Sequence, residues 1–148
     1  MALDYGRRRI GVAVTDPTRT IATPRGVIER PKRGAPAAAL PRTLTALVAE
    51  IGPAAILIGI PFAMDGTAGT MAEEVRAFAR ALGEATGVRT IEWDERLSTA
   101  RAEREILAMN LPQAKRRQKG RTDEMAAALM LSAYLRGVGA GDAVGERP

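Results

Sequence analysis

The chain has 148 residues, the length of a single domain, and it contains neither cysteine nor histidine. Their absence excludes disulfide bonds, thiolate or imidazole metal sites, and catalysis by a histidine base. The 22 basic and 17 acidic residues give a net charge of +5 at pH 7, which reflects either a general enrichment in arginine and alanine or a polyanionic partner.

The first thirty residues predict three β-strands. Residues 1–5 and 9–15 are short apolar or β-branched runs, and residues 21–30 form a third run after the turn signal Asp16-Pro17. The connections between the runs are too short for a crossover, so we expect three antiparallel neighbours.

The middle of the chain predicts alternating helices and strands. Apolar residues at helical spacing predict a helix over residues 40–51, and an uninterrupted apolar run predicts a strand over residues 54–60 that is covered on both faces. After a loop over residues 61–69, Thr70-Met71-Ala72-Glu73 has the pattern of a capping box and predicts a second helix.

The last third of the chain predicts four segments in succession: a strand over residues 88–93, a helix over residues 98–110, a basic loop over residues 115–121, and a helix over residues 123–136. Three meandering strands followed by alternating helices and strands belong to the α/β class. They predict a mixed five-stranded sheet, first antiparallel and then parallel, with helices on both faces. We expect residues 1–137 to form one domain and residues 138–148 to form a flexible tail.

The chain shows no pattern of membrane insertion or export. No apolar run reaches the roughly 18 residues that a membrane-spanning helix needs, and no basic-then-apolar leader opens the sequence. We therefore expect a cytoplasmic protein without a membrane partner.

Three acidic stretches lie at strand ends or at a helix start: Leu3-Asp4-Tyr5-Gly6, Asp94-Glu95 and Thr122-Asp123. In an α/β fold, such positions gather side chains into a site. Carboxylates brought together stay ionised when a cation joins them, and oxygen ligands suit Mg²⁺ or Mn²⁺. The pattern therefore predicts an acidic metal site.

Two of these carboxylates also have structural interpretations. Asp4 could support the turn that follows it, although an unpaired carboxylate inside an apolar run is costly to bury. Asp123 could interact with the helix dipole after an N-cap at Thr122. The apolar helix that follows favours a covered position for Asp123.

The acidic stretch Asp94-Glu95 does not show which of its two carboxylates would be the metal ligand. By strand alternation Glu95 shares the side of Trp93, and Asp94 faces the other side of the sheet. Either could reach the site, or both could form a surface ion pair with Arg96.

Basic residues flank the predicted acidic site at both ends of the chain. The candidates for contacts to a phosphate backbone are Arg7, Arg8, Arg9, Arg96, Lys115, Arg116, Arg117, Lys119 and Arg121. Arginine binds phosphate oxygens in pairs, and positive charge beside an acidic metal site is typical of a nuclease. The loop over residues 59–66 is either a further phosphate cradle built from backbone N–H groups or a plain connection.

Five motifs resemble the YqgF (RuvX-type) family and occur in the same order. They are Leu3-Asp4-Tyr5-Gly6, the RIGVAVTD sequence at residues 9–16, Gly59-Ile60-Pro61 with Asp65-Gly66, the DERLST sequence at residues 94–99, and the DEMAA sequence at residues 123–127. The resemblance covers residues 3–135. It implies an RNase H-like fold and a metal-dependent nuclease acting in 5′-end maturation of pre-16S rRNA, or alternatively a Holliday junction resolvase.

The resemblance also implies the site residues. It assigns catalysis and the binding of one or two Mg²⁺ or Mn²⁺ ions to Asp4, Glu95 and Asp123, and so prefers Glu95 to Asp94. The implied partner is an rRNA precursor, which a monomer could process, or branched DNA, whose symmetric cleavage requires a homodimer. Family members carry several residues before the first strand, whereas Asp4 lies almost at the start here, so we expect a short first strand.

Two other functions compete with the nuclease. A nucleic-acid-binding module without catalysis would not need the three carboxylates, all of which are present. A sugar-kinase or actin-like ATP-binding fold also begins with an Asp-x-Gly hairpin. That architecture normally has two such domains, and 148 residues supply one.

Overall fold

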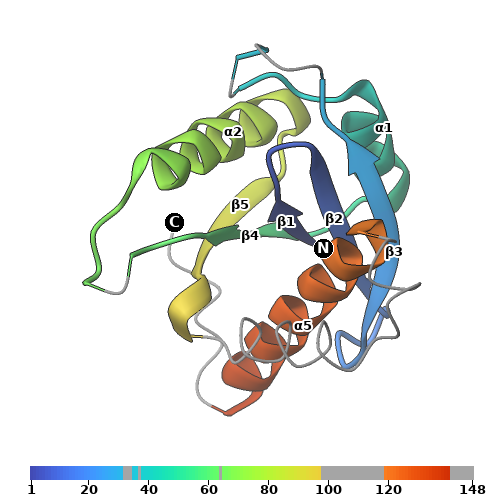
Figure 1. The fold of residues 1–148 in the computed structure, drawn as a ribbon. Coiled ribbons are helices and arrows are strands. Elements are labelled where there is room, and N and C mark those ends of the chain that lie inside the picture. The colour runs from blue at the N-terminus through green and yellow to red at the C-terminus, as the bar shows by residue number, and fades with distance from the viewer. Residues whose placement is uncertain (32–34, 37, 64, 98–118, 141–148) are drawn as a thin grey trace.

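The computed structural model describes residues 1–31, 35–36, 38–63, 65–97 and 119–140 (Figure 1). In chain order, its elements are β1 (Ala2–Tyr5), β2 (Arg9–Thr15), β3 (Ala22–Glu29), α1 (Arg42–Ile51), β4 (Ala55–Ile60), α2 (Thr70–Thr86), β5 (Arg89–Asp94), the single 3₁₀ turn η1 (Glu95–Leu97) and α5 (Lys119–Ala140). Within these residues, no helix is both long and apolar enough to cross a membrane.

The five strands form one sheet in the order β3-β2-β1-β4-β5. The first three strands pair antiparallel, and β4 is parallel to both β1 and β5. This arrangement confirms the predicted mixed sheet. The short β1, with only 4 residues, lies at the centre and has a strand on each side.

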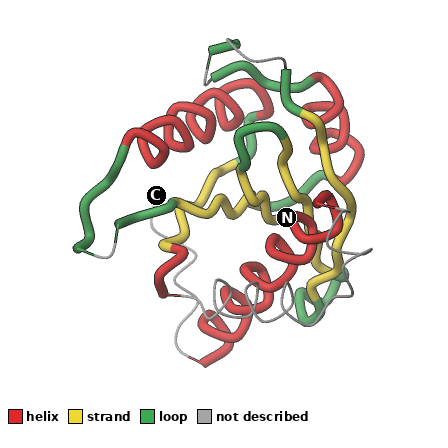
Figure 2. The backbone as a smooth tube through the Cα atoms, viewed as in Figure 1, coloured by secondary structure: helices red, strands yellow, loops and turns green. Residues whose placement is uncertain are grey.

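Helices cover both faces of this sheet, with α1 and α2 on one face and α5 on the other (Figures 1 and 2). The two-residue period of β1 divides its side chains between these layers. Leu3 and Tyr5 pack in the core beneath α1 and α2, whereas Ala2 packs against Ala127 of α5. Asp4 alternates with Leu3 and Tyr5, so its side chain lies on the face that α5 covers.

The capping box predicted at Thr70 is wrong. Gly69 is the N-cap of α2, no side chain caps the helix, and Thr70 is already helical. The Glu73 side chain, which a capping box would turn back toward the helix start, instead forms an ion pair with Arg76 at 3.2 Å.

The last helix begins earlier and ends later than predicted. Because α5 starts at Lys119, Asp123 lies in its second turn and Thr122 is not its N-cap. Residues 119–121, expected in the basic loop, are helical; Lys119 and Arg121 are good helix formers, although Gly120 between them is not. The helix also passes Gly137, where the tail was expected to start. The helix predicted over residues 98–110 and the tail over residues 141–148 lie outside the described residues.

Arg30, directly after β3, ties down the turn between β1 and β2. Its Nη1 atom donates to the carbonyl oxygens of Gly6 and Arg7 at 3.1 Å each and lies 3.5 Å from Oε1 of Glu74. Its guanidinium stacks over the ring of Tyr5, whose hydroxyl donates to Glu74 Oε1 at 2.8 Å. Burial and this hydrogen bond raise the pKa of Tyr5, so the hydroxyl stays protonated at neutral pH.

We expect Arg30→Met to destabilise the protein by about 2 kcal/mol, because two turn carbonyls and a partly buried carboxylate lose their donor. In a protein of this size that is a fall of about 4–8 °C in Tm, measurable by thermal denaturation. Arg25→Met is the matched control, because Arg25 is exposed and its ion pair with Glu50 spans 3.6 Å at the surface. Equal Tm values for the two variants would contradict the assigned role of Arg30.

Candidate active site

Asp4 is the one acidic residue that is buried among the described residues, with 8% of its surface exposed. It lies on the central strand, on the face covered by α5, and one residue before the end of β1. Burying a carboxylate costs free energy unless its charge is compensated. A buried carboxylate at the end of a central strand is therefore a candidate for function.

A glycine on β2 brings α5 down beside Asp4. Gly11 is the cross-strand partner of Asp4, so the side-chain positions of both residues lie on the same face. A Cβ atom at Gly11 would lie 2.0 Å from the carbonyl oxygen of Asp123 and 2.8 Å from the amide nitrogen of Glu124. The backbone of α5 therefore rests directly on Gly11, which places Asp123 over the strand residue that pairs with Asp4.

A second glycine, on β4, makes room for Glu95 on the other side of Asp4. Ala2 and Leu3 pair with Leu57 and Ile58, and one further step along this parallel register sets Gly59 beside Asp4. A Cβ atom at Gly59 would lie 2.6 Å from Oε1 of Glu95. The Glu95 carboxylate thus occupies the space that a side chain at Gly59 would fill.

The same contact decides which member of the Asp94-Glu95 pair faces the site. The position of a Gly59 Cβ is also 3.0 Å from Sδ of Met130, a residue of α5, so Glu95 lies on the α5 face of the sheet. Trp93 packs on the same face, against Tyr134. The alternation predicted from the sequence is confirmed for Glu95.

The fold therefore brings Asp4, Glu95 and Asp123 to one face of the sheet, around the end of β1. Glu95 and Asp123 are half-buried. As the described side chains stand, no group of three acidic residues is close enough to hold a metal ion. The three residues lie on the same face of the sheet, and binding one cation would require a change in side-chain conformation that brings their carboxylate oxygens together.

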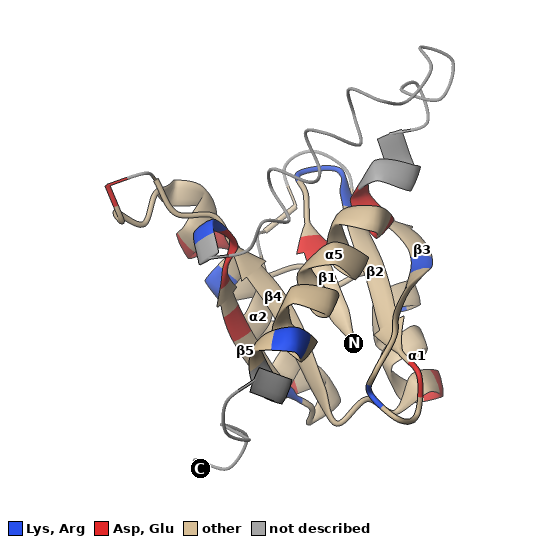
Figure 3. Cartoon of the chain, turned by 90° about the horizontal axis from the view of Figure 1, so that it is seen from below, with Lys and Arg blue, Asp and Glu red and all other residues tan. Residues whose placement is uncertain are grey.

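Eight of the nine predicted basic residues fall into three groups. Arg7 and Arg8 are exposed in the turn after β1, and Arg9 begins β2; Figure 3 shows this basic turn at the same end of the sheet as the start of α5. The side chains of Lys119 and Arg121 are not described, although both residues are helical. Lys115, Arg116 and Arg117 lie outside the described residues, so their predicted role stays a prediction.

Arg96, the remaining predicted basic residue, is bound by its neighbour. Its Nε and Nη2 atoms donate to both carboxylate oxygens of Asp94, the shortest contact being 2.7 Å from Nη2 to Oδ2. These hydrogen bonds hold the pKa of Asp94 below its usual value. Asp94 therefore forms an ion pair with Arg96. By strand alternation its side chain lies on the opposite face of the sheet from Glu95.

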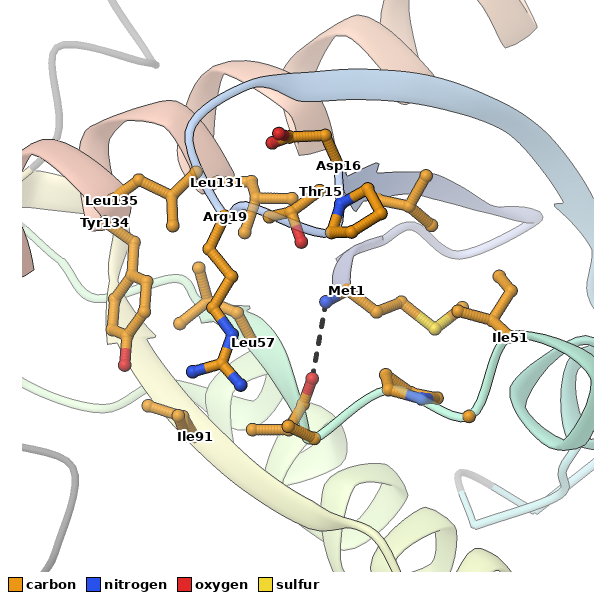
Figure 4. A pocket seen from close by; sticks show the side chains of 16 residues that line it. Met1, Thr15, Asp16, Arg19, Ile51, Leu57, Ile91, Leu131, Tyr134 and Leu135 are labelled. Atoms are coloured by element: carbon orange, nitrogen blue, oxygen red, sulfur yellow. Dashed lines mark hydrogen bonds between the residues drawn. The ribbon is translucent and has the colours of Figure 1, made fainter.

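A cavity of about 440 Å³ lies at the other end of the sheet, where β1 and β4 begin (Figure 4). The amino group of Met1 donates across it to the carbonyl oxygen of Ala55 at 3.3 Å, and Arg19 points between Leu57 and Tyr134. Its one acidic side chain, Asp16, accepts hydrogen bonds from its own loop. This cavity does not hold the candidate site.

Gly11 and Gly59 are the site residues that the sequence analysis missed. Both interrupt β-rich runs, and a glycine inside a strand often marks the close approach of another backbone or side chain. That signal was present in the sequence, but it does not reveal which segment approaches.

A mixed five-stranded sheet in this order, with a buried aspartate on its central strand and helices on both faces, defines an RNase H-like fold. The family model described as RuvX, Holliday junction resolvase, matches residues 1–137. The chain belongs to the RuvX family, which is the family that the five sequence motifs resemble.

Curated relatives support the same family. A protein of Agrobacterium fabrum, named "Putative pre-16S rRNA nuclease", is 44% identical over 133 residues, which are 90% of this chain and 80% of the relative. A Rhizobium meliloti protein of the same name is 42% identical and covers 90% of this chain and 77% of the relative. The match places the chain in a family of enzymes that hydrolyse phosphodiester bonds.

The fold is also similar to that of a solved nuclease. The structure of T. thermophilus RuvC in complex with a Holliday junction substrate superimposes with a TM-score of 0.56, at 16% sequence identity, over 91% of each chain. At this identity the likeness confirms the fold.

Proposed function

We propose that this chain is a divalent-metal-dependent nuclease that acts in 5′-end maturation of pre-16S rRNA in the cytoplasm. The observation that carries the proposal is the position of Asp4, buried on the central strand between two glycines that admit Glu95 and the backbone of Asp123. The relatives named for pre-16S rRNA support the choice of substrate.

Asp4, Glu95 and Asp123 would hold the metal. Their donors are all oxygen atoms, which Mg²⁺ and Mn²⁺ prefer. Because Gly59 has no side chain, the Glu95 carboxylate can lie over it, on the same face of the sheet as Asp4. When bound, one or two such ions would lower the pKa of an attacking water and neutralise charge on the scissile phosphate.

The remaining tasks, which are accepting the proton of the attacking water and binding the phosphate backbone, would fall to the protein or to the substrate. The buried Asp4 would supply a carboxylate held in place by the central strand, whereas the half-buried Glu95 and Asp123 would contact both the cation and the substrate. Because the chain has no histidine, a carboxylate or a substrate oxygen must accept the proton of the water. The exposed Arg7 and Arg8 lie at the same end of the sheet and would bind the phosphate backbone.

A second candidate substrate is the four-way DNA junction. The description of the family model and the fold likeness to a junction-bound RuvC favour it. Cutting a junction symmetrically requires two active sites, so this alternative predicts a homodimer, whereas rRNA maturation is compatible with a monomer.

The deciding experiment compares two end-labelled substrates, a precursor fragment of 16S rRNA and a four-way DNA junction, each with Mg²⁺ or Mn²⁺. Cleavage of the RNA alone would support rRNA maturation. Paired symmetric cuts in the junction would assign a resolvase instead. Binding without cleavage of either substrate would favour a non-catalytic module.

Gly59→Ala should separate activity from stability. Its Cβ would meet the ends of two flexible side chains, Glu95 and Met130, so we expect the fold to lose only about 1–2 kcal/mol. The Glu95 carboxylate must leave its place, and cleavage should fall about 100-fold. Gly69→Ala is the control, because a Cβ there meets nothing within 4 Å. Wild-type rates in Gly59→Ala would show that the position of Glu95 over Gly59 is not required.

A further inference from the structure

Arg96 is held in one orientation by Asp94. Besides the side-chain contacts, the Arg96 amide donates to Asp94 Oδ1 at 2.9 Å, so the carboxylate binds both the backbone and the guanidinium of the same residue. The side chains are 35% exposed for Arg96 and 19% exposed for Asp94. An arginine fixed in this way has less freedom to follow a flexible phosphate backbone than an arginine in open solvent.

The guanidinium of Arg96 rests on the loop between β4 and α2. Its Cζ atom lies 5.2 Å from the ring centre of Phe62, and Nη1 donates to the carbonyl oxygen of Ala63 at 3.5 Å. A Cβ atom at Gly66, where φ is +85°, would lie 3.3 Å from the same Nη1. The loop therefore fits closely around the guanidinium.

The described residues of this loop are hydrogen-bonded to one another. The Ala63 amide donates to Thr67 at 3.0 Å, the Gly66 amide donates back to Ala63 at 2.9 Å, and Asp65 accepts from the amide and hydroxyl of Thr67. Arg76 stacks on the same Phe62 ring, at 5.5 Å. Arg96 thus connects two segments, the β4–α2 loop and the end of β5.

Asp94 and Arg96, joined by these hydrogen bonds, are called the clamp. Glu95 is the residue between them in the sequence. It begins the single turn of η1, and its carboxylate reaches Gly59, two residues before the loop begins. We propose that Arg96 is a positioning residue: through Asp94 and the β4–α2 loop it keeps Glu95 over Gly59, and it does not serve as a phosphate contact. The proposal rests on the proposed nuclease function, in which Glu95 is a ligand of the catalytic cation.

The test measures single-turnover cleavage, the Kd for the same substrate and the salt dependence of Kd in Arg96→Gln, Arg96→Lys and Asp94→Asn. We expect each variant to lose about 10- to 100-fold in cleavage rate with Kd nearly unchanged, because a small displacement of a catalytic group is costly. Lysine should not restore the rate, because it lacks the planar fork that binds a carboxylate through two nitrogens. The double variant Asp94→Asn/Arg96→Gln should cleave no more slowly than either single variant. The effects should not add, because each single change already disrupts the same Asp94–Arg96 interaction.

A phosphate contact would give the opposite pattern. Arg96→Gln would then weaken binding and reduce the salt slope of log K by about 1, and Arg96→Lys would restore most of the affinity that Arg96→Gln had lost. Weaker binding by Arg96→Gln, with recovery in Arg96→Lys, would overturn the proposal. Arg25→Gln is the control, since Arg25 is an exposed arginine on β3 whose carboxylate partner is Glu50 of α1.

Amide hydrogen exchange tests the clamp even if no substrate is cleaved. In Arg96→Gln, peptides covering residues 61–69 and 94–97 should both exchange about 10-fold faster, while those of the central strands stay unchanged. Unchanged exchange in these peptides would refute the clamp. If the wild-type protein cut neither RNA nor DNA, the proposed function would be refuted. Faster exchange of these peptides in Arg96→Gln would still support the role of Arg96 in holding the two segments together.

Discussion

Replacing Asp4 by asparagine is expected to abolish cleavage, with a loss of at least about 1000-fold in rate, while nucleic-acid binding is retained. Asparagine has nearly the same shape, so the packing between β1 and α5 should persist. What disappears is the charge of the one buried acidic residue in the described part of the chain.

Two measurements check this prediction: the cleavage rate, and the change in Tm on adding Mn²⁺. The wild type should gain stability with Mn²⁺ and Asp4→Asn should gain much less, since only a ligand that binds the folded state raises Tm. Asp16→Asn is the matched control, because Asp16 is a half-buried aspartate in the loop after β2, at the other end of the sheet, and its substitution should leave cleavage unchanged. Substantial cleavage by Asp4→Asn would refute the assignment of the site.

Gly11→Ala should have the largest effect on the fold. Its Cβ would lie 2.0 Å from the carbonyl oxygen of Asp123 and 2.3 Å from its carbonyl carbon, and backbone atoms cannot turn aside as a side chain can. The second turn of α5 must therefore move off the sheet. We expect a loss of about 3 kcal/mol or more, which corresponds to a fall of about 6–12 °C in Tm. Cleavage should fall as well, because Asp123 moves with the helix.

Gly137→Ala provides the control on the same helix. Gly137 is exposed, and a Cβ there meets nothing within 4 Å, so alanine should stabilise α5 by about 0.5–1 kcal/mol. The two substitutions add the same methyl group and should shift Tm in opposite directions. If Gly11→Ala melted within about 2 °C of the wild type, the close contact between α5 and β2 would be wrong.

The sheet could be predicted from the sequence because its signals are local. Three β-rich runs separated by turns of a few residues fix the antiparallel part, and the apolar run that became β4 has the composition of a strand covered on both faces. The same two-residue period correctly put Glu95 on the side of Trp93. Asp4 stood out because a carboxylate is rare inside an apolar strand.

Other features depend on contacts that a sequence pattern does not contain. Thr70 and Glu73 have the spacing of a capping box, but Glu73 is drawn to Arg76. Thr122 has the composition of an N-cap, but α5 is already helical from Lys119, so Thr122 was a misleading boundary. The choice between a phosphate contact and a structural ion pair for Arg96 depends on where Phe62 and Ala63 lie, and only the folded chain shows that.

The position of β1 at the middle of the sheet has a consequence for how the protein responds to warming. Asp4 stands on a strand that has neighbours on both sides, so it loses its place only when the whole domain unfolds. Glu95 stands on one 3₁₀ turn that follows an edge strand, and such a turn frays at a much smaller cost in free energy. The position of Glu95 that the proposed function requires should therefore be lost at a lower temperature than the fold. On warming, cleavage should be lost reversibly below the Tm of the domain.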